Sequence, residues 1–289
     1  SSAEPAHVAF YGGSFTALPL ETQKTYLTAV QPFIQAGHIA DIRLSTRPDC
    51  ITNEVLTLLK KYHVTTIELG VQSLDDAVLT RSGRGHTAAD TVNAVRLIKS
   101  HDFLIGLQLM PGLPGDSADS FMRTVNAIIE LEPDFVRIYP ALVIKDTPLE
   151  GLYLSGRYLP LLLDDAVLLC RDALERFELA GIDVIRLGLQ PTEELEKPGT
   201  IIAGPYHPAF KQLVESSILL DKMRSALLTR TVKTGRVTFQ VNPRDLSAAI
   251  GQRRSNIGLL KNEFGLREVC IVANDAIPRK GLPNLLSVF

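Results

Sequence analysis

Polar side chains interrupt or end several apolar runs of this sequence, at positions where they could bind a ligand. Gln108 lies inside the apolar run Leu104–Met110, and Gln72 directly follows another apolar run. A buried amide without a partner costs on the order of a few kcal/mol, so Gln108 faces either a structural hydrogen-bond partner or a cavity. Ser45 and Tyr139 end two further runs of the same kind.

Arginines and paired glycines accompany these positions. Arg47 could contact a carboxylate or a phosphate of a ligand, or it could pair with Asp49 two residues on. Arg84 lies on a polar loop behind one of the apolar runs. Gly12 and Gly13 follow the first run, and glycines let the backbone approach a ligand closely. A plain tight turn would need the same two glycines.

Short apolar runs alternate with helical patterns along the first two thirds of the chain. This alternation predicts β-strands joined by helices in a parallel sheet, with six strands. The polar residues named above would then share the carboxyl edge of the sheet, where barrels and open sheets bind ligands. The expected strands are His7–Tyr11, Ile39–Leu44, Thr66–Val71, Leu104–Met110, Phe135–Tyr139 and Asp183–Gly188; the expected helices are Leu20–Ala36, Thr52–Tyr62, Asp90–His101, Ser117–Leu131 and Asp164–Ala180; a polar loop is expected up to His86.

Composition and missing motifs narrow the functional class. The 289 residues are 45% hydrophobic and 21% charged, which is typical of a globular protein. No apolar run approaches the roughly 18–20 residues that cross a bilayer, and no signal-peptide pattern is present, so we expect a cytoplasmic protein. Cys50, Cys170 and Cys270 are too dispersed for a disulfide framework or a clustered metal site. The sequence has no obvious catalytic triad, HExxH, P-loop or GxGxxG.

The C-terminal part is basic, whereas the rest of the chain is acidic. Residues 221–289 hold 12 Lys/Arg and 5 Asp/Glu, a net charge of +7, and the remainder holds 18 and 27, a net charge of −9. Such a segment fits a polyanionic partner, or simply a solvated basic face. A strand at Arg236–Val241, a helical stretch Asp245–Phe264 interrupted by Gly251, and a strand at Glu268–Val272 predict a compact α+β module.

A short motif in this module points to nucleic acid. Residues 250–257 have the sequence IGQRRSNI. KH domains clamp a nucleic-acid backbone on a glycine-containing loop between two helices; the I-G-x-x-G-x-x-I spacing fits here, but Arg254 replaces the second glycine. Arg253 and Arg254 add attraction for phosphate, so we expect an RNA-binding site at Arg253, Arg254 and Lys261. The alternative is a helix–turn–helix with an exposed basic turn.

Five motifs, in their order and spacing, resemble those of the radical S-adenosylmethionine (SAM) superfamily. The resemblance is closest to its Elp3-like branch, which is related to oxygen-independent coproporphyrinogen oxidase, and it covers most of the chain. The motifs are FYGGSFT (10–16), STRPD (45–49), ELGVQS (68–73), GRGHT (83–87) and QLMPGLPG (108–115).

The resemblance implies an α/β fold, a partial (β/α)6 radical-SAM-type barrel with a small C-terminal α+β KH-like module. The implied domains are the barrel over residues 1–190 without its first strand and cluster loop, a Gly/Pro-rich crossing segment and helix over 191–220, and the basic KH-like module over 221–289. SAM would lie across the strand ends. The implied SAM contacts are Gly12, Gly13, Ser14, Ser45, Gln72, Arg84, Gln108 and Tyr139.

The resemblance also implies a [4Fe–4S] cluster, for which this sequence has no ligands. The family binds the cluster on a CxxxCxxC loop, and ligation needs clustered thiolates. The three cysteines of this chain are far apart. We expect the cluster ligands upstream of residue 1, in a segment that the sequence lacks, rather than a loss of the chemistry.

These features predict a radical SAM enzyme that cleaves SAM reductively to a 5′-deoxyadenosyl radical and modifies RNA, with tRNA as the expected substrate. One alternative is the same chemistry on a small molecule, and another is a non-catalytic RNA-binding protein on a degenerate barrel. The resemblance implies an electron donor such as flavodoxin or ferredoxin, and from the lack of a long apolar run we expect no membrane partner. We expect no Elp3-type acetyltransferase domain, and no catalytic side chain is identified.

Overall fold

The computed structural model of the chain describes residues 5–229 and 235–287. The chain divides into two compact units, Ser1–Leu162 with Ala173–Tyr206 and Leu163–Asp172 with His207–Phe289. The boundary expected at residues 220/221 falls inside one continuous helix, α8 (Phe210–Leu228). Each unit is described by itself below.

A parallel sheet of six strands forms the centre of the first unit, counted over the described residues. Its order β1-β2-β3-β4-β5-β7 follows the chain, as consecutive β/α units of a barrel do. The six parallel strands expected from the sequence are therefore confirmed, and the sheet is that of a partial (β/α) barrel. The strands are β1 (Ala6–Phe10), β2 (Ile39–Thr46), β3 (Val64–Gln72), β4 (Leu104–Leu109), β5 (Phe135–Ile138) and β7 (Asp183–Leu187).

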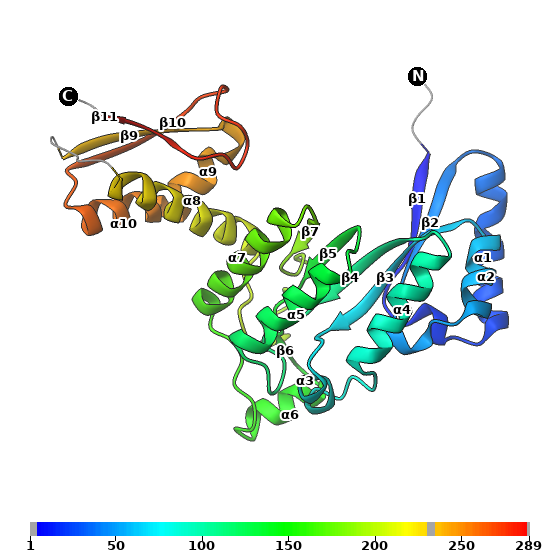
Figure 1. The fold of residues 1–289 in the computed structure, drawn as a ribbon. Coiled ribbons are helices and arrows are strands. Elements are labelled where there is room, and N and C mark those ends of the chain that lie inside the picture. The colour runs from blue at the N-terminus through cyan, green and yellow to red at the C-terminus, as the bar shows by residue number, and fades with distance from the viewer. Residues whose placement is uncertain (1–4, 230–234, 288–289) are drawn as a thin grey trace. The chain divides into compact units, whose positions relative to one another are not determined.

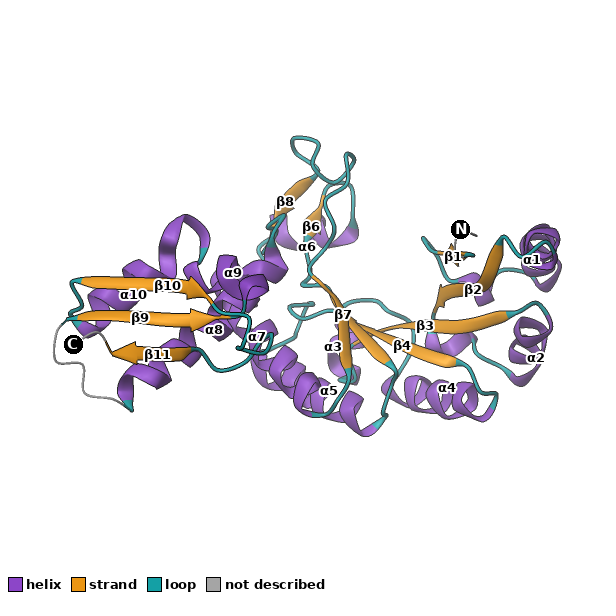
Figure 2. Cartoon of the chain, turned by 90° about the horizontal axis from the view of Figure 1, so that it is seen from above, coloured by secondary structure: helices purple, strands orange, loops and turns teal. Residues whose placement is uncertain are grey.

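Helices cover one face of this sheet, as Figures 1 and 2 show for α2, α4 and α5. Leu44 and Ile67 of the strands and Leu56, Ile98 and Phe121 of the helices are almost completely buried. Burying such side chains is the main stabilising contribution to a fold of this kind. The helices are α1 (Leu20–Gln35), α2 (Asn53–Lys61), α4 (Ala88–Ser100), α5 (Ala118–Glu130) and the part of α7 (Leu163–Leu179) that begins at Ala173.

Side-chain caps fix where two of these helices begin. The Thr87 hydroxyl accepts a hydrogen bond from the Asp90 backbone N–H, and the Asp90 carboxylate accepts one from the Thr87 N–H at 2.7 Å. This capping lowers the pKa of Asp90. Ser117 and Ser120 make the corresponding capping box at the start of α5. Each cap ends a loop that leaves the carboxyl edge of the sheet, so the loop geometry is set locally.

Several short helices and strands were not predicted from the sequence. The expected polar loop up to His86 contains a helix, α3 (Asp76–Arg81), which Asp75 caps. The segment after β5 contains β6 (Val143–Ile144) and α6 (Pro148–Leu154). The Gly/Pro-rich crossing segment contains β8 (Ile201–Ala203), which pairs antiparallel with β6. Elements this short show no periodicity in the sequence, and the pairing of β6 with β8 is non-local.

The second unit packs three helices against a small sheet of order β10-β9-β11 (Figure 1). Strand β9 (Arg236–Val241) runs parallel to β10 (Glu268–Ala273), as expected for strands separated by two helices. It runs antiparallel to β11 (Asn284–Ser287), which the sequence analysis did not predict. The helices are α8, α9 (Leu246–Ile250) and α10 (Ser255–Phe264), and the expected interruption at Gly251 is confirmed.

Candidate functional site

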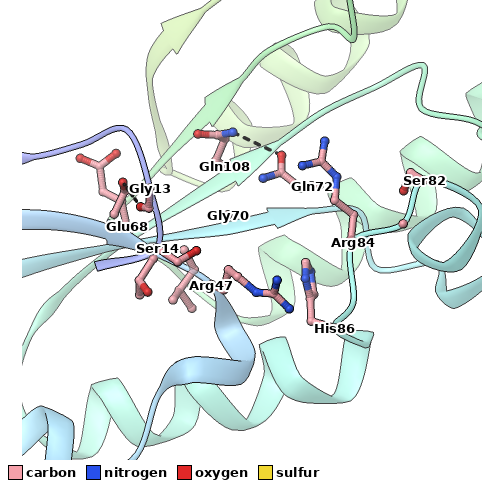
Figure 3. Close-up of a pocket in the computed structure, with 14 residues that line it drawn as sticks. Gly13, Ser14, Arg47, Glu68, Gly70, Gln72, Ser82, Arg84, His86 and Gln108 are labelled. Carbon is pink, nitrogen blue, oxygen red and sulfur yellow. Dashed lines mark hydrogen bonds between the residues drawn. The ribbon is translucent and has the colours of Figure 1, made fainter. Parts of the chain in front are cut away.

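Polar residues from several strand ends surround a cavity of about 400 Å³ at the carboxyl edge of the first sheet. We call this cavity the sheet-end pocket (Figure 3). It brings together residues that lie far apart in the sequence, because parallel strands end at one edge. Seven of the residues singled out from the sequence line it, namely Gly13, Ser14, Ser45, Arg47, Gln72, Arg84 and Gln108.

An irregularity at the end of β3 orients Gln72. The pairing of β3 with β4 shifts register between Leu69 and Gln72, and Gln72 has a φ of 65°. A non-glycine residue in the left-handed region is uncommon and marks a locally constrained site. Gly70 leaves room for the amide, since a Cβ there would lie 2.9 Å from Gln72 Nε2.

Gln108 was expected to face either a structural hydrogen-bond partner or a cavity, and it faces both. Its Nε2 donates a hydrogen bond to Gln72 Oε1 at 3.2 Å, and both side chains line the pocket. Figure 3 shows this pair above β3, with Arg84 beside Gln72. The two amides present donors and acceptors from fixed positions to any ligand in the pocket.

Arg84 brings a cation into the pocket without a carboxylate partner. The only hydrogen bond that its side chain donates within the described residues goes to Met110 Sδ at 3.1 Å, and its buried Nε has none. Burial lowers the pKa of Arg84. An uncompensated, desolvated charge is costly, so this part of the pocket favours an anionic group that would pair with it.

Arg47 lies on the same pocket wall, but its charge is already compensated. Its Nε and NH2 groups donate to the two carboxylate oxygens of Asp49 at 2.9 and 2.7 Å, and NH2 also donates to the Gly85 carbonyl at 3.1 Å. The ion pair with Asp49, one of the two alternatives left open by the sequence, is thus formed. The hydrogen bonds to Asp49 also raise the pKa of Arg47.

Two further pocket residues were not identified individually as site residues. His86 is 7% exposed; its Nε2 lies 3.1 Å from the Val71 carbonyl, and its buried Nδ1 has no partner within the described part of the chain. A hydrogen bond from Nε2 to this carbonyl leaves Nδ1 as the ring atom that could contact a ligand. Glu68 is 5% exposed. Its position inside an apolar run is the same signal that had singled out Gln108.

Gly12 and Tyr139, also expected to contact SAM, are not among the residues that line the pocket. Gly12 has a φ of 100°, a conformation that favours glycine in the turn after β1. The Tyr139 hydroxyl accepts a hydrogen bond from Arg137 NH1 at 3.4 Å. Their assignment as SAM contacts stays a prediction.

In the second unit, residues 251–254 form the turn between α9 and α10, which we call the basic turn. Arg253 and Arg254 have φ values of 51° and 63°, are exposed, and donate no side-chain hydrogen bond to any residue that the structure describes. Buried Asn256 holds the turn, because its Nδ2 donates to the carbonyls of Ser216 and Ala249, each at 3.1 Å. Lys261 lies farther along α10 and is half-buried.

The chain does not supply ligands for a [4Fe–4S] cluster. Its three cysteines, Cys50, Cys170 and Cys270, are free thiols on separate elements. Burial raises the pKa of the Cys170 thiol, which disfavours the thiolate that a metal requires. Within the described ranges, no group of three or more His, Cys, Asp or Glu side chains could hold a metal ion. None of the helices in those ranges is long and apolar enough to cross a membrane.

Comparison with known proteins links the fold and the pocket to one family. Residues 3–128 match the model of the radical SAM superfamily, and residues 133–219 match that of the radical SAM C-terminal domain. The chain is 35% identical over 127 residues to tRNA uridine(34) acetyltransferase of Methanocaldococcus jannaschii, covering 43% of this chain and 24% of the relative. It is 30% identical over 171 residues to Elongator complex protein 3 of Mus musculus, covering 51% and 30%.

Solved structures give the same result. Elp3 of Methanocaldococcus infernus, with residues 1–46 deleted, superposes with a TM-score of 0.64 at 25% identity, over 78% of this chain and 55% of that one. The chain thus spans about half of that solved chain and about a quarter of the tRNA uridine(34) acetyltransferase.

A partial (β/α) barrel with a polar pocket at the carboxyl ends of its strands is the arrangement found in barrel enzymes. The two matching models together account for most of the residues from 3 to 219. The chain belongs to the radical SAM superfamily, and it is homologous to Elp3 and to the archaeal Elp3-like proteins.

Proposed function

We propose that this chain is the SAM-binding barrel of a radical SAM enzyme that modifies RNA, with tRNA as the substrate. The observation that carries the first half of the proposal is the cation of Arg84, which has no carboxylate partner among the described residues, in a pocket lined mainly by polar side chains and glycines. SAM is a sulfonium compound with a carboxylate, an amino group and ribose hydroxyls, and each of these three kinds of polar group is assigned a counterpart among the pocket residues.

Arg84 is assigned to the SAM carboxylate, because guanidinium–carboxylate pairing would neutralise a cation that has no other anion within the described residues. Gly12, Gly13 and Ser14 are assigned to the amino group, because their backbone carbonyl oxygens and the Ser14 hydroxyl can accept hydrogen bonds from it. Ser45, Gln72 and Gln108 are assigned to the remaining polar groups of SAM, and Tyr139 to the neighbourhood of the adenine.

The assignment of Arg84 to the SAM carboxylate is tested by changing the ligand and leaving the protein unchanged. Equilibrium dialysis of the chain against SAM and against decarboxylated SAM compares two ligands that differ in the carboxylate. We expect SAM to bind about 100-fold more tightly, since pairing with a desolvated cation is worth about 3 kcal/mol. Equal affinities would contradict the assignment of Arg84.

A [4Fe–4S] cluster, when bound, supplies the electron that cleaves SAM to methionine and a 5′-deoxyadenosyl radical. The residues of this chain bind and orient SAM and exclude water from it; they do not ligate the cluster. The reaction is tested with anaerobically reconstituted protein from the complete reading frame, by measuring 5′-deoxyadenosine. The absence of both cluster absorbance and SAM cleavage would contradict the proposal.

RNA as the substrate is supported by the basic turn and by the relatives. Arg253 and Arg254 have exposed side chains on a backbone in the left-handed region, so their guanidinium groups can contact phosphates. Lys261 lies on the helix that follows. One set of relatives is named tRNA uridine(34) acetyltransferase.

The RNA proposal is tested by charge reversal in the turn. Arg253→Glu with Arg254→Glu should weaken tRNA binding at least tenfold in a filter-binding assay and reduce its salt dependence. The matched control is Arg96→Glu, an exposed arginine on α4. Unchanged affinity and salt dependence in the double variant would contradict an RNA substrate bound at this turn and favour a small-molecule substrate.

A further inference from the structure

The inner face of the first sheet, opposite the helices, carries a cluster of charged side chains centred on Glu68. The Tyr11 hydroxyl donates to Glu68 Oε1 at 2.6 Å. Arg137 donates through Nε to Oε2 at 2.6 Å and through NH2 to Oε1 at 3.2 Å. Glu68 also lines the sheet-end pocket, so the cluster and the pocket are contiguous.

Arg43 is a second guanidinium at the same carboxylate, but it is poorly paired. It lies on β2 between Ile42 and Leu44, both fully buried, so strand alternation turns it to the face opposite theirs. Its Nε lies 3.3 Å from Glu68 Oε1, yet this buried atom has no hydrogen bond of acceptable geometry within the described residues. The better donors Tyr11 and Arg137 already occupy the carboxylate.

The cluster therefore holds more positive than negative charge. Arg43 and Arg137 share one carboxylate, which leaves one positive charge uncompensated. Tyr11 adds no negative charge, since burial and Glu68 raise its pKa to about 12. On the same face of β2, Asp41 pairs instead with His7, whose Nδ1 lies 2.7 Å away.

A third arginine extends the surplus along the sheet. Arg186 of β7 stands opposite Arg137 of β5 in the strand register. Its NH2 donates to the neutral amide oxygen of Gln190 at 2.6 Å, and no carboxylate pairs with it among the residues that the structure describes. Guanidinium groups without carboxylates on one partly enclosed face suit an oxyanion with several acceptor oxygens, and phosphate is bound bidentately by such groups.

We propose that Arg43, with Arg137 beside it, forms a phosphate subsite on the inner face of the barrel, which holds a phosphate of the substrate nucleotide next to the sheet-end pocket. The proposal rests on RNA being the substrate, as argued above. Arg43 makes the direct contact, because its guanidinium lacks a hydrogen-bonded partner. Glu68 holds Arg137 and Tyr11 through hydrogen bonds and competes with a phosphate for the two guanidinium groups, so that the net charge of the subsite is one positive unit.

The test uses uridine 5′-monophosphate and uridine as probes, which differ in the phosphate group. Binding is measured by calorimetry at low ionic strength on the full chain carrying Arg253→Gln and Arg254→Gln, so that the basic turn does not contribute. In this parent we expect the nucleotide to bind at least tenfold more tightly than the nucleoside. Arg43→Gln should remove this difference, and Arg43→Lys should keep part of it, since lysine retains the charge but loses the planar donor fork.

The matched control is Arg96→Gln, which makes the same substitution on exposed α4 and should leave both affinities unchanged. Glu68→Gln removes the competing carboxylate and should tighten nucleotide binding severalfold; it provides a second measurement if Arg43→Gln fails to fold. Equal binding of nucleotide and nucleoside by the parent, or an Arg43→Gln variant that behaves like Arg96→Gln, would overturn the proposal. SAM binding, measured in the same samples, reports separately on the proposed function.

Discussion

The sheet-end pocket and the basic turn both hold arginines, but the two regions treat those charges in opposite ways. Arg84 in the pocket is partly buried, and burial lowers its pKa, whereas Arg253 and Arg254 in the turn are exposed. A desolvated charge binds one partner of matching shape strongly, while exposed charges attract any polyanion and are screened by salt. This contrast fits the two proposed sites, one for SAM in the first unit and one for a nucleic-acid backbone in the second.

The largest effect is expected from Arg84→Met. Removing the guanidinium should lower SAM affinity about 100-fold, while the free energy of unfolding stays the same or rises by about 1 kcal/mol, because an unpaired buried charge disappears. Dialysis gives the affinity and urea denaturation gives the stability. Arg96→Met, on exposed α4, should change neither quantity. A clear loss of stability in Arg84→Met would mean that the cation has a structural partner.

The next largest effect concerns the shape of the basic turn. Gly251 has φ 75° and ψ 162°, and a Cβ there would lie 2.4 Å from Ser255 Oγ. Gly251→Ala should therefore destabilise the second unit by about 2 kcal/mol.

Gly258→Ala is the matched control for this change, since a Cβ at this exposed helical position meets nothing within 4 Å. It should stabilise the chain by up to about 1 kcal/mol through helix propensity. Equal effects of the two substitutions in thermal denaturation would show that the turn tolerates a side chain.

In the unmodified chain, salt should weaken ligand binding at the basic turn much more than at the sheet-end pocket. If Arg253, Arg254 and Lys261 each neutralise one phosphate, the slope of log affinity against log salt is about −2 for single-stranded RNA. Raising salt from 50 to 200 mM should then weaken RNA binding about 20-fold. SAM binding in the enclosed pocket should change less than about twofold. A steep salt dependence for SAM would place its binding on the protein surface.

The smallest effect is a pH dependence in the first unit. The Tyr158 hydroxyl donates to the Gly112 carbonyl at 2.6 Å, and burial raises the pKa of Tyr158 to about 12. The folded state therefore keeps this proton more tightly than the unfolded state. Its contribution is complete below pH 10 and is lost as the pH rises from 10 to 12.

With allowance for solvent screening, the alkaline loss amounts to about 1 kcal/mol. Tyr158→Phe should flatten the stability curve between pH 10 and 12 in urea titrations. An equally steep decline in the variant would assign the loss to other groups.

Much of the fold could be predicted from the sequence, because its long elements have clear periodicities. The six strands and the helices between them are found within a few residues of their expected bounds. Elements that depend on non-local pairing were missed. Strand β11 pairs with β9, from which two helices and β10 separate it in the sequence, and its own residues carry little strand pattern.

The candidate site was predicted in part. Gln72 and Gln108 were singled out as polar groups beside apolar runs, and the structure brings them into one hydrogen-bonded pair. His86 and Glu68 were not named as site residues. Glu68 carries the signal that singled out Gln108, a polar residue inside an apolar run, whereas His86 lies on a polar loop, where the sequence gives no such signal. Gln72 has a φ of 65° at a register shift between β3 and β4. This shift depends on a distant part of the chain, since Gln108 of β4 lies 36 residues after Gln72.

The sequence by itself determined the alternation of strands and helices, the edge at which the polar residues gather and the spacing of the basic turn, because these follow from local periodicity and from the geometry of parallel strands. Only the tertiary structure decided which arginines are neutralised. Arg47 meets Asp49 and the carbonyl of Gly85, whereas Arg84 meets no carboxylate within the described residues, and Arg43 competes with Arg137 for Glu68. Charge compensation depends on distances between separate strands and loops, and those distances exist only once the sheet has formed.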